Sequence, residues 1–247
     1  MELNTKKHTP EQLNTLMGCF SINQEEFTFS PLTAGLINDT YLVQRQEKPL
    51  YILQRINHDI FNNVDGLMQN ISKALESLNS EGYTQILVLP IASGAHYTKT
   101  DEGYWRLMTF ISESTTYNTT SDTYIAFEAG RIIGKFHKLL EDEELLDYKD
   151  TIPHFHDLNL REVQFKNALV AASKLKLASA IHEIEIAHKT LVKLQKIDIS
   201  ALKTRICHND TKLNNILFSK KSNKALCLID LDTIMKGYFF YDFGDAV

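Results

Sequence analysis

Two short stretches near the end of the sequence carry side chains whose types and spacing could do chemistry. The first is His208-Asn209-Asp210, which is followed by Asn215, and the second is an apolar run that ends at Asp230. Asp210 supplies a carboxylate that can orient an attacking hydroxyl group and accept its proton. Asn215 and Asp230 offer the hard oxygen ligands that Mg²⁺ prefers in proteins. Together these residues indicate transfer of a phosphoryl group to a hydroxyl group.

The spacing H-x-D-x-x-x-x-N between His208 and Asn215 is that of the catalytic loop of protein kinases. Within it, Lys212 could place an ammonium group on the transferred phosphoryl group. Asp232 lies on the same side of its strand as Asp230, so it is an alternative metal ligand or a supporting acid. A single Asp or Asn before a strand is usually a turn residue. Here the acid, the amide and the acid at a strand end occur together, which favours a site.

The same side chains allow a second chemistry. His208, Asp210, Asp230 and Asp232 could bind two metal ions in a phosphoesterase. Such sites usually draw on several histidines. Other histidines of the chain lie on or between predicted helices: His137, His154, His156, His182 and His188. The phosphotransfer interpretation therefore comes first.

The residues expected to bind a nucleotide are less distinctive. Residues 33–40 form a loop between two predicted strands, and Gly35 and Asn38 could contact phosphates there. One glycine is a weak signature, so an ordinary hairpin is the alternative. Arg55 ends a predicted strand and could pair with the α/β-phosphates or simply lie in solvent. Glu76 is the acid on the following helix that could brace this arginine.

Composition limits the kind of protein. The 247 residues are 43% apolar and 23% charged, as in ordinary globular proteins. The net charge of −5 argues against a nucleic-acid partner. The three cysteines lack C-x-x-C spacing, which favours a reducing cytoplasm over a disulfide framework. No signal peptide is recognisable, and no run approaches the roughly 18 apolar residues of a membrane span. We therefore expect a cytoplasmic protein whose partner is a small molecule; the sequence is silent on oligomeric state.

The predicted elements that position these residues begin with strands. Residues 27–56 have a strand-like texture, and apolar residues at helical spacing predict a helix over 65–78. Three more strands follow, the last two joined by a hairpin: 86–90, 94–99 and 104–110. The first 110 residues are therefore predicted to form a mostly antiparallel sheet with one inserted helix.

The pattern then changes to helices. Residues 112–122 are rich in Ser and Thr without an apolar period, which indicates a linker. Long helices are predicted at 123–140, 160–174 and 178–195, and short strands at 206–207, 216–218 and 226–229. The sequence thus predicts an α+β, bilobal fold. Its sheet-rich, nucleotide-binding N-terminal lobe is residues 1–111, and its mainly helical C-terminal lobe, with the catalytic loop, is residues 112–247.

The motifs resemble those of the aminoglycoside phosphotransferase and choline kinase superfamily. The motifs that carry the resemblance are residues 208–215, 229–232 and 241–245. Residues 36–43 and 51–57 make the chain most similar to the N-acetylhexosamine 1-kinases within that superfamily. The resemblance covers roughly residues 30 to 247, and the C-terminal motifs are its most specific part.

The resemblance implies a protein-kinase-like fold, ATP and Mg²⁺, and phosphorylation of a small-molecule hydroxyl, above all the anomeric hydroxyl of an N-acetylhexosamine. It implies that Asp210 is the catalytic acid and that Asn215 and Asp230 bind the metal. It also implies that Arg55 binds phosphate and that adenine lies on backbone groups near Thr109 to Ile111.

Three further points follow from the resemblance. Asp242 matches a second family acid, usually structural, that steadies the loops around the site. Asn209 stands where the superfamily often has glycine, although the hexosamine kinases resemble this sequence there. Family members continue with further helices beyond the position of Val247, so we expect part of the substrate pocket to be missing from this chain. The alternatives are a kinase of choline, homoserine, methylthioribose or an aminoglycoside, and a nucleotide-binding chain without catalysis.

Overall fold

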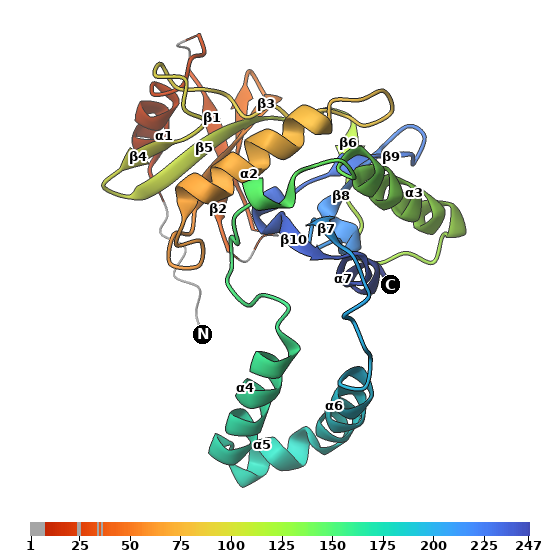
Figure 1. The fold of residues 1–247 in the computed structure, drawn as a ribbon. Helices are drawn as coiled ribbons and strands as arrows, with labels where there is room; N and C mark the ends of the chain where they lie inside the picture. Colours follow the sequence, from red (N-terminus) through yellow and green to blue (C-terminus); the bar gives the residue numbers. More distant parts are fainter. Residues whose placement is uncertain (1–7, 24–25, 34, 36) are drawn as a thin grey trace. The chain divides into compact units, whose positions relative to one another are not determined.

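The computed structural model describes residues 8–23, 26–33, 35 and 37–247. Contacts divide the chain into two compact units, residues 1–152 with 205–247 and residues 153–204. The predicted fold class is confirmed, because an antiparallel sheet dominates the N-terminal part and helices dominate the C-terminal part (Figure 1). The predicted lobe boundary between residues 111 and 112 stays a prediction.

The N-terminal part is built on a five-stranded antiparallel sheet in the order β1-β2-β3-β5-β4. Its strands are β1 Thr28–Leu32, β2 Asp39–Arg45, β3 Lys48–Ile56, β4 Thr98–Thr100 and β5 Gly103–Thr109. β-branched and aromatic residues are frequent in β2, β3 and β5, in keeping with their strand propensity. The predicted strands within 27–56 and at 104–110 and the hairpin between β4 and β5 are therefore confirmed in type, whereas the strand predicted at 94–99 begins only at Thr98.

The prediction of a strand at 86–90 is wrong, because this segment does not form a regular strand. This segment lies along β5, because the Leu89 N–H donates to the Leu107 carbonyl and the Thr109 N–H donates to the Leu87 carbonyl. It forms only an isolated bridge between Val88 and Met108. β4 already pairs with the start of β5, and Pro90 has no N–H to donate, so the pairing stops after a few residues.

Alternation along β3 and β5 gives the sheet two faces. The pairs Arg55–Trp105 and Gln54–Arg106 are neighbours in register, so they lie on opposite faces. We call the side of Arg55 and Trp105 the α1 face, because Trp105 packs in one core cluster with residues of helix α1, Pro10–Met17. The side of Gln54 and Arg106 is the α2 face, where Arg106 contacts Met68 of helix α2, Val64–Ser77.

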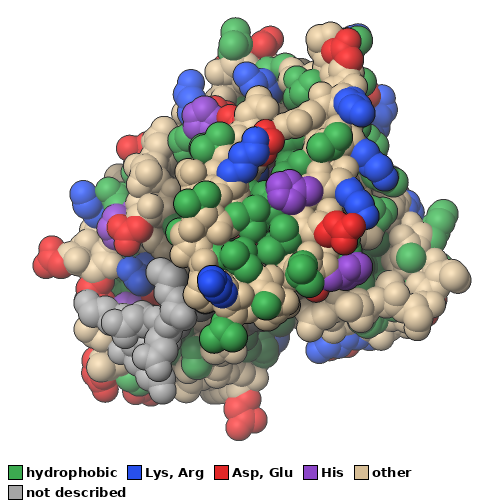
Figure 2. All heavy atoms as spheres, turned by 90° about the horizontal axis from the view of Figure 1, so that it is seen from below, with side chains coloured by type: hydrophobic (Ala, Val, Ile, Leu, Met, Phe, Trp, Pro, Cys, Tyr) green, Lys and Arg blue, Asp and Glu red, His purple; other side chains and the backbone are tan. Residues whose placement is uncertain are grey.

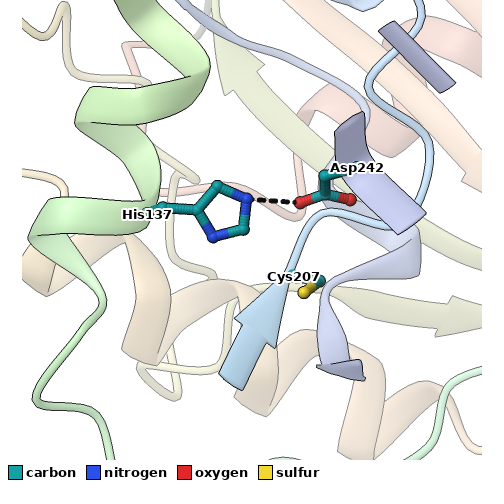
Figure 3. Close-up of side chains that lie close together, drawn as sticks. All are labelled: His137, Cys207 and Asp242. Carbon is teal, nitrogen blue, oxygen red and sulfur yellow. Dashed lines mark ion pairs between the residues drawn. The ribbon is translucent and has the colours of Figure 1, made fainter. Parts of the chain in front are cut away.

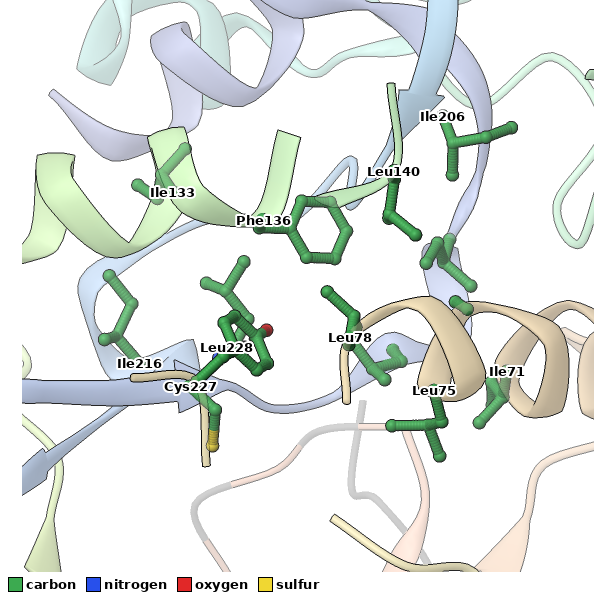
Figure 4. Packing of buried hydrophobic residues seen from close by; sticks show 14 of the residues in the cluster. Ile71, Leu75, Leu78, Ile133, Phe136, Leu140, Ile206, Ile216, Cys227 and Leu228 are labelled. Carbon is green, nitrogen blue, oxygen red and sulfur yellow. Dashed lines mark hydrogen bonds between the residues drawn. The ribbon is translucent and has the colours of Figure 1, made fainter. Parts of the chain in front are cut away.

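Helices α2 and α3 (Thr123–Leu139) confirm the predictions at 65–78 and 123–140. Asn63 and Asp122 cap their N-termini through side-chain oxygens. Their apolar sides share a core with the C-terminal strands, as Figure 4 shows for Leu75, Phe136 and Leu228. Among the described residues, no helix combines the length and the apolarity needed to cross a membrane.

Short strands and turns hold the polar motifs. β6 Ser114–Thr115, β8 Ile216–Ser219 and β9 Ala225–Leu228 form a three-stranded sheet in the order β6-β8-β9. β7 Thr204–Cys207 pairs with β10 Met235–Tyr238, and helix α7, Phe239–Ala246, follows. The short 3-10 helices η1 Leu145–Asp147, η2 Leu213–Asn215 and η3 Leu231–Thr233 complete this part. The predicted linker 112–122 is thus partly structured, because β6 completes the free edge of β8.

The second unit consists of helices α4 Leu158–Ala171, α5 Lys174–Ser179 and α6 Ile181–Leu194. The predicted helix at 160–174 ends early, because Ala172 is extended and Ser173 caps α5 instead. Phe165 of α4 contacts His188 of α6 at 5.2 Å between ring centroids. No described residue of these helices is fully buried, and many apolar side chains reach the surface. Figure 2 shows hydrophobic side chains at the surface of the protein, with Lys, Arg and His side chains among them.

Candidate active site

The catalytic-loop residues meet as their spacing predicts. Asp210 is half-buried, and its Oδ2 accepts from Lys212 Nζ at 2.6 Å and from Asn215 Nδ2 at 2.9 Å. Asn215 Nδ2 also donates to the Asp210 carbonyl at 2.9 Å, so the turn η2 folds the amide back onto the acid. Among the described residues, the hydrogen bonds to the Asp210 carboxylate fall on Oδ2. Oδ1 is therefore the oxygen available to a hydroxyl group.

Asp230 is brought to this loop by the residue before it. The Ile229 N–H donates to the Asn215 carbonyl at 2.8 Å, and the Ile229 carbonyl accepts from His208 Nε2 at 2.8 Å. His208 is fully buried and donates through Nε2, so it supports the strand end and is not placed as a metal ligand. Asp230 itself has φ 61° and ψ 53°, a left-handed conformation that is uncommon for a residue with a side chain. The chain therefore leaves the strand direction at Asp230 and enters the short 3-10 helix η3.

The exposure of Asp230 and its surroundings have opposite effects on its pKa. Its side chain is exposed at the surface. Nevertheless, loss of water around the carboxylate and the neighbouring Asp232 charge raise the pKa of Asp230 to about 6, while Arg106 and His208 oppose the rise. A bound cation would reduce the repulsion between the Asp230 carboxylate and the neighbouring acids.

Asp232 lies in a different environment from Asp230. It is buried, its Oδ1 lies 2.5 Å from Arg106 Nη1, and its Oδ2 accepts from Asn38 Nδ2 at 2.6 Å. Arg106 is also held by Gln54, whose Oε1 accepts from Arg106 Nε at 3.0 Å. The structure thus brings Asn38, one of the residues predicted to bind the nucleotide, to the motif that contains Asp230.

Arg55 is not brought to this cluster. Its Nη2 lies 2.5 Å from Asp39 Oδ2, and its Nε donates to the same oxygen at 2.7 Å, on the α1 face of the sheet. The predicted brace, Glu76, is wrong: that side chain is exposed, and the acid partner of Arg55 is Asp39 of the neighbouring strand. A role for Arg55 in phosphate binding stays a prediction.

Of the other residues predicted to bind the nucleotide, Gly35 is exposed, and a Cβ added to it would meet nothing within 4 Å. Its neighbours Ala34 and Leu36 lie outside the described residues. Thr109 is hydrogen-bonded to the segment before β4: its N–H donates to the Leu87 carbonyl, and its Oγ1 accepts from the Leu87 N–H. In the described part of the chain, no hydrogen bond uses the Ile111 N–H, while the Ile111 carbonyl accepts from Ser114. Ile111 is therefore the better placed of these two for a base.

Asp242 supports the catalytic loop from beneath. It is fully buried, and its carboxylate accepts from the backbone N–H groups of His208 at 2.9 Å and Asn209 at 2.6 Å. His137 Nε2 lies 2.9 Å from the same carboxylate, as Figure 3 shows. Burial opposes the charge, but the His137 contact and the nearby His208 outweigh it and hold the pKa of Asp242 below its usual range. The loop is therefore anchored on a buried carboxylate.

Cys207 lies beside His137 and Asp242, and their potential ligand atoms are within 4.8 Å of one another (Figure 3). A metal would need a thiolate, whereas burial and then the Asp242 charge raise the pKa of the Cys207 thiol. The Asp242 oxygens already accept backbone hydrogen bonds. His137, Cys207 and Asp242 therefore fit a structural role better than a metal site.

The residues at the loop fit a divalent cation. The amide hydrogens of Asn215 are engaged by Asp210, so its Oδ1 is the atom left to bind a ligand. Asp230 adds an exposed carboxylate. Both are hard oxygen donors of the kind that Mg²⁺ selects. A pocket of about 380 Å³ lies elsewhere, lined by residues such as Thr84, Glu128 and Arg131, and does not include these donors.

Arg106 and Gln54 are the residues that the sequence interpretation missed. Arg106 stands between the apolar residues Trp105 and Leu107, and Gln54 directly follows the apolar run Leu50-Tyr51-Ile52-Leu53. A charge in the middle of a buried strand needs a partner, and that signal was available. The identity of the partner, Asp232, was not, because it is 126 residues away (232 minus 106).

The comparisons with known proteins agree with this geometry. Residues 28–247 match the phosphotransferase enzyme family, and the chain belongs to that family. An amicoumacin kinase in complex with AMP-PNP, Ca²⁺ and Ami superposes with a TM-score of 0.62 at 13% identity, covering 97% of this chain and 68% of that one. A microcompartment-associated aminopropanol kinase superposes with a TM-score of 0.60 at 18% identity, covering 95% of this chain and 73% of that one.

A third solved structure is the ternary complex of an aminoglycoside phosphotransferase with streptomycin and ATP. It superposes with a TM-score of 0.54 at 18% identity, covering 94% of this chain and 72% of that one. At these identities the likeness establishes the fold, which is the protein-kinase-like fold of small-molecule phosphotransferases. The superfamily expected from the motifs is confirmed by the family match over residues 28–247.

Proposed function

We propose that this phosphotransferase uses ATP and a divalent cation to phosphorylate a hydroxyl group of a small molecule. The observation that carries the proposal is the Asp210 carboxylate, held on one oxygen by Lys212 and Asn215 and open on the other. The neighbouring structures that contain ATP, AMP-PNP and Ca²⁺ support a nucleotide and a cation.

Each residue has a role in this proposal. Asp210 Oδ1 orients the attacking hydroxyl and accepts its proton as the hydroxyl oxygen bonds to the γ-phosphorus of ATP; the bond from that phosphorus to the bridging oxygen breaks, and ADP leaves with that oxygen. Lys212 carries a positive charge at the point where charge develops on the transferred group. Asn215 and Asp230 would hold Mg²⁺, which when bound neutralises charge on the nucleotide phosphates. Asp242 keeps the loop in place through the backbone of His208 and Asn209.

The nucleotide would lie between the loop and the sheet. Asn38 and Gly35 belong to the β1–β2 connection, and Asn38 is fixed to Asp232. Thr109 and Ile111 follow along β5, where the adenine is proposed to bind backbone groups. For Arg55 the proposal requires that the phosphates compete with Asp39, since that carboxylate already holds the guanidinium.

The finer proposal is that the acceptor is the anomeric hydroxyl of an N-acetylhexosamine. It is supported by the resemblance of residues 36–43 and 51–57 to the N-acetylhexosamine 1-kinases. A screen of Mg²⁺-dependent ATP consumption across N-acetylhexosamines, choline, amino acids and aminoglycosides tests it. Consumption that rises most with an N-acetylhexosamine, giving the 1-phosphate by ³¹P NMR, is the expected result, and a stronger response to another acceptor class would reassign the substrate.

A nucleotide-binding protein without catalysis is the second candidate. The observation that favours it is the exposure of apolar side chains near the end of the described chain, Phe239, Phe240 and Phe243. Calorimetry separates the two: binding of ATP–Mg²⁺ without binding of any acceptor supports the second candidate. Binding of both, followed by ADP release, supports the first.

A further inference from the structure

The ion pair between Arg106 and Asp232 joins the sheet to the turn that follows Asp230. The side chains are only 2% and 3% exposed, and the two atoms lie 2.5 Å apart. Removing two charges from water is costly, and the close contact between the opposite charges offsets part of that cost. The roles assigned above to the catalytic loop do not use Arg106.

Both carboxylate oxygens of Asp232 are engaged by the N-terminal part of the chain. Arg106 of β5 takes Oδ1, and Asn38 of the β1–β2 connection donates to Oδ2. Asn38 is itself fixed, because its Oδ1 accepts from the Asn57 N–H at 2.9 Å. Asp232 therefore has its lone pairs directed into the sheet, unlike the exposed carboxylate of Asp230.

The turn η3 is tied at its other side to the catalytic loop. Thr233 Oγ1 donates to the His208 carbonyl at 2.7 Å, and the Thr233 carbonyl accepts from Asn209 Nδ2 at 2.9 Å. Asp230 is the residue before this turn and has the left-handed backbone conformation. A left-handed conformation at an Asp persists only where its surroundings fix it, and the contacts of Asp232 and Thr233 do so.

We propose that Arg106 is a positioning residue of the phosphotransfer site: it holds Asp232 against the α2 face as a neutral pair, so that Asp230 is the acid presented to the divalent cation. This inference rests on the proposed function. Gln54 assists by holding the guanidinium through Oε1. Asp232 is then a supporting acid, and its charge is matched within the protein before any cation binds.

The test is a paired substitution read by Mn²⁺ affinity. Mn²⁺ is titrated into the full chain in the presence of a non-hydrolysable ATP analogue, and free Mn²⁺ is measured by electron paramagnetic resonance. Asp232→Asn leaves the Arg106 charge unbalanced next to Asp230, and we expect Mn²⁺ affinity to fall by about tenfold or more. In the double variant Arg106→Met with Asp232→Asn, both charges are gone, and we expect affinity to return to within about threefold of the unmodified chain.

Arg131→Met is the matched control. Arg131 also pairs with a buried acid, Glu128, and donates to the backbone carbonyl of Ala225, but among the described residues it makes no hydrogen bond or ion pair with Asp232. We expect its melting temperature to fall while Mn²⁺ affinity stays within about twofold, because sites without shared partners behave independently. Melting curves of all variants establish that each is folded before its affinity is compared.

The outcomes are distinct. Recovery in the double variant supports the inference. A double variant as weak as Asp232→Asn would overturn it, because an Asp232 oxygen would then be a direct ligand, and so would an Asp232→Asn variant that binds Mn²⁺ normally. An unmodified chain that binds no Mn²⁺ with the analogue would overturn the proposed function itself, a result recognisable before any variant is made.

Discussion

Neighbouring strands of the five-stranded sheet each carry an arginine that pairs with an aspartate, on opposite faces. On the α1 face, Arg55 pairs with Asp39, and their side chains are 23% and 13% exposed. On the α2 face, Arg106 pairs with Asp232, and theirs are 2% and 3% exposed. The first pair links two adjacent strands, whereas the second links the sheet to the turn after Asp230. Strand alternation puts the two arginines on opposite faces, and packing decides that the α2 face is the one that meets the turn after Asp230.

The two arginines are the same residue type, so their different roles follow from how deeply each is buried and which residues it contacts. The α1 face is stabilised mainly by apolar contacts between α1 and residues such as Leu53 and Trp105. The polar contacts of the α2 face continue through Asp232 and Thr233 to the catalytic loop. Replacing a polar residue of the α2 face should therefore cost much stability, and replacing a polar residue of the α1 face should cost little.

The largest effect is expected for Arg106→Met. This change leaves the Asp232 carboxylate buried without its counter-ion, so we expect the free energy of unfolding to fall by about 3–5 kcal/mol. Urea denaturation measures it. Addition of Asp232→Asn should restore most of the loss, which keeps the prediction testable if the single variant is unfolded. A single variant that loses less than about 1 kcal/mol would show that the pair behaves like a surface ion pair.

The next effect concerns acid stability and Asp242. The folded state holds the pKa of this carboxyl below its usual range, so the unfolded chain binds a proton more readily. Its contribution is thus fully present above the ordinary aspartate pKa of about 4 and is lost as the pH falls through the lower folded value. Asp242→Asn should be less stable at neutral pH and lose less on acidification. Urea midpoints from neutral pH to about pH 3 test this, and parallel curves for the two proteins would contradict it.

A smaller loss is expected for Gly237→Ala. A Cβ there would lie 2.7 Å from Asn209 Oδ1 and 3.2 Å from Cys207 Cβ. Since Asn209 is fixed by the Thr233 carbonyl and by Asp242, it cannot move freely, and we expect a cost of about 1–3 kcal/mol from overpacking. Thermal unfolding gives the value. Gly244→Ala is the matched control, because its Cβ would meet nothing within 4 Å.

The smallest effect is expected for Arg55→Met on the α1 face. Its ion pair is partly exposed to water, so we expect the free energy of unfolding to change by about 1 kcal/mol or less. The same urea assay used for Arg106→Met gives a direct comparison. A loss as large as that of Arg106→Met would remove the distinction between the two faces.

The sequence predicts the parts of this site that are local. Asp210, Lys212 and Asn215 lie within one short loop, so their spacing alone brings them together, as the structure confirms. The hairpin of β8 and β9 carries Asp230 to the same loop, and its apolar strands were recognisable. Helix α1 carried a readable signal too, because Thr9, Pro10 and Gln12 form a capping box with proline at the first turn.

The remaining features depend on contacts between distant segments. Alternation shows that Arg55 and Gln54 face opposite ways, but both faces of the sheet are covered, so no pattern tells which face meets the catalytic loop. The strand predicted at 86–90 failed for the same reason, since β4 pairs with part of β5 and leaves this segment only a few contacts with it. Partner choice in these cases is decided by tertiary packing rather than by local preference.

The central claim, that Asp210 is the acid of a phosphotransfer site, is tested most directly by Asp210→Asn. The measurement is ATP-dependent phosphorylation of the acceptor found in the screen, together with binding of a non-hydrolysable ATP analogue with Mg²⁺. Because the amide cannot accept the proton, we predict that turnover falls by about 10²- to 10⁴-fold while the analogue still binds. Turnover close to that of the unmodified protein would contradict the assignment.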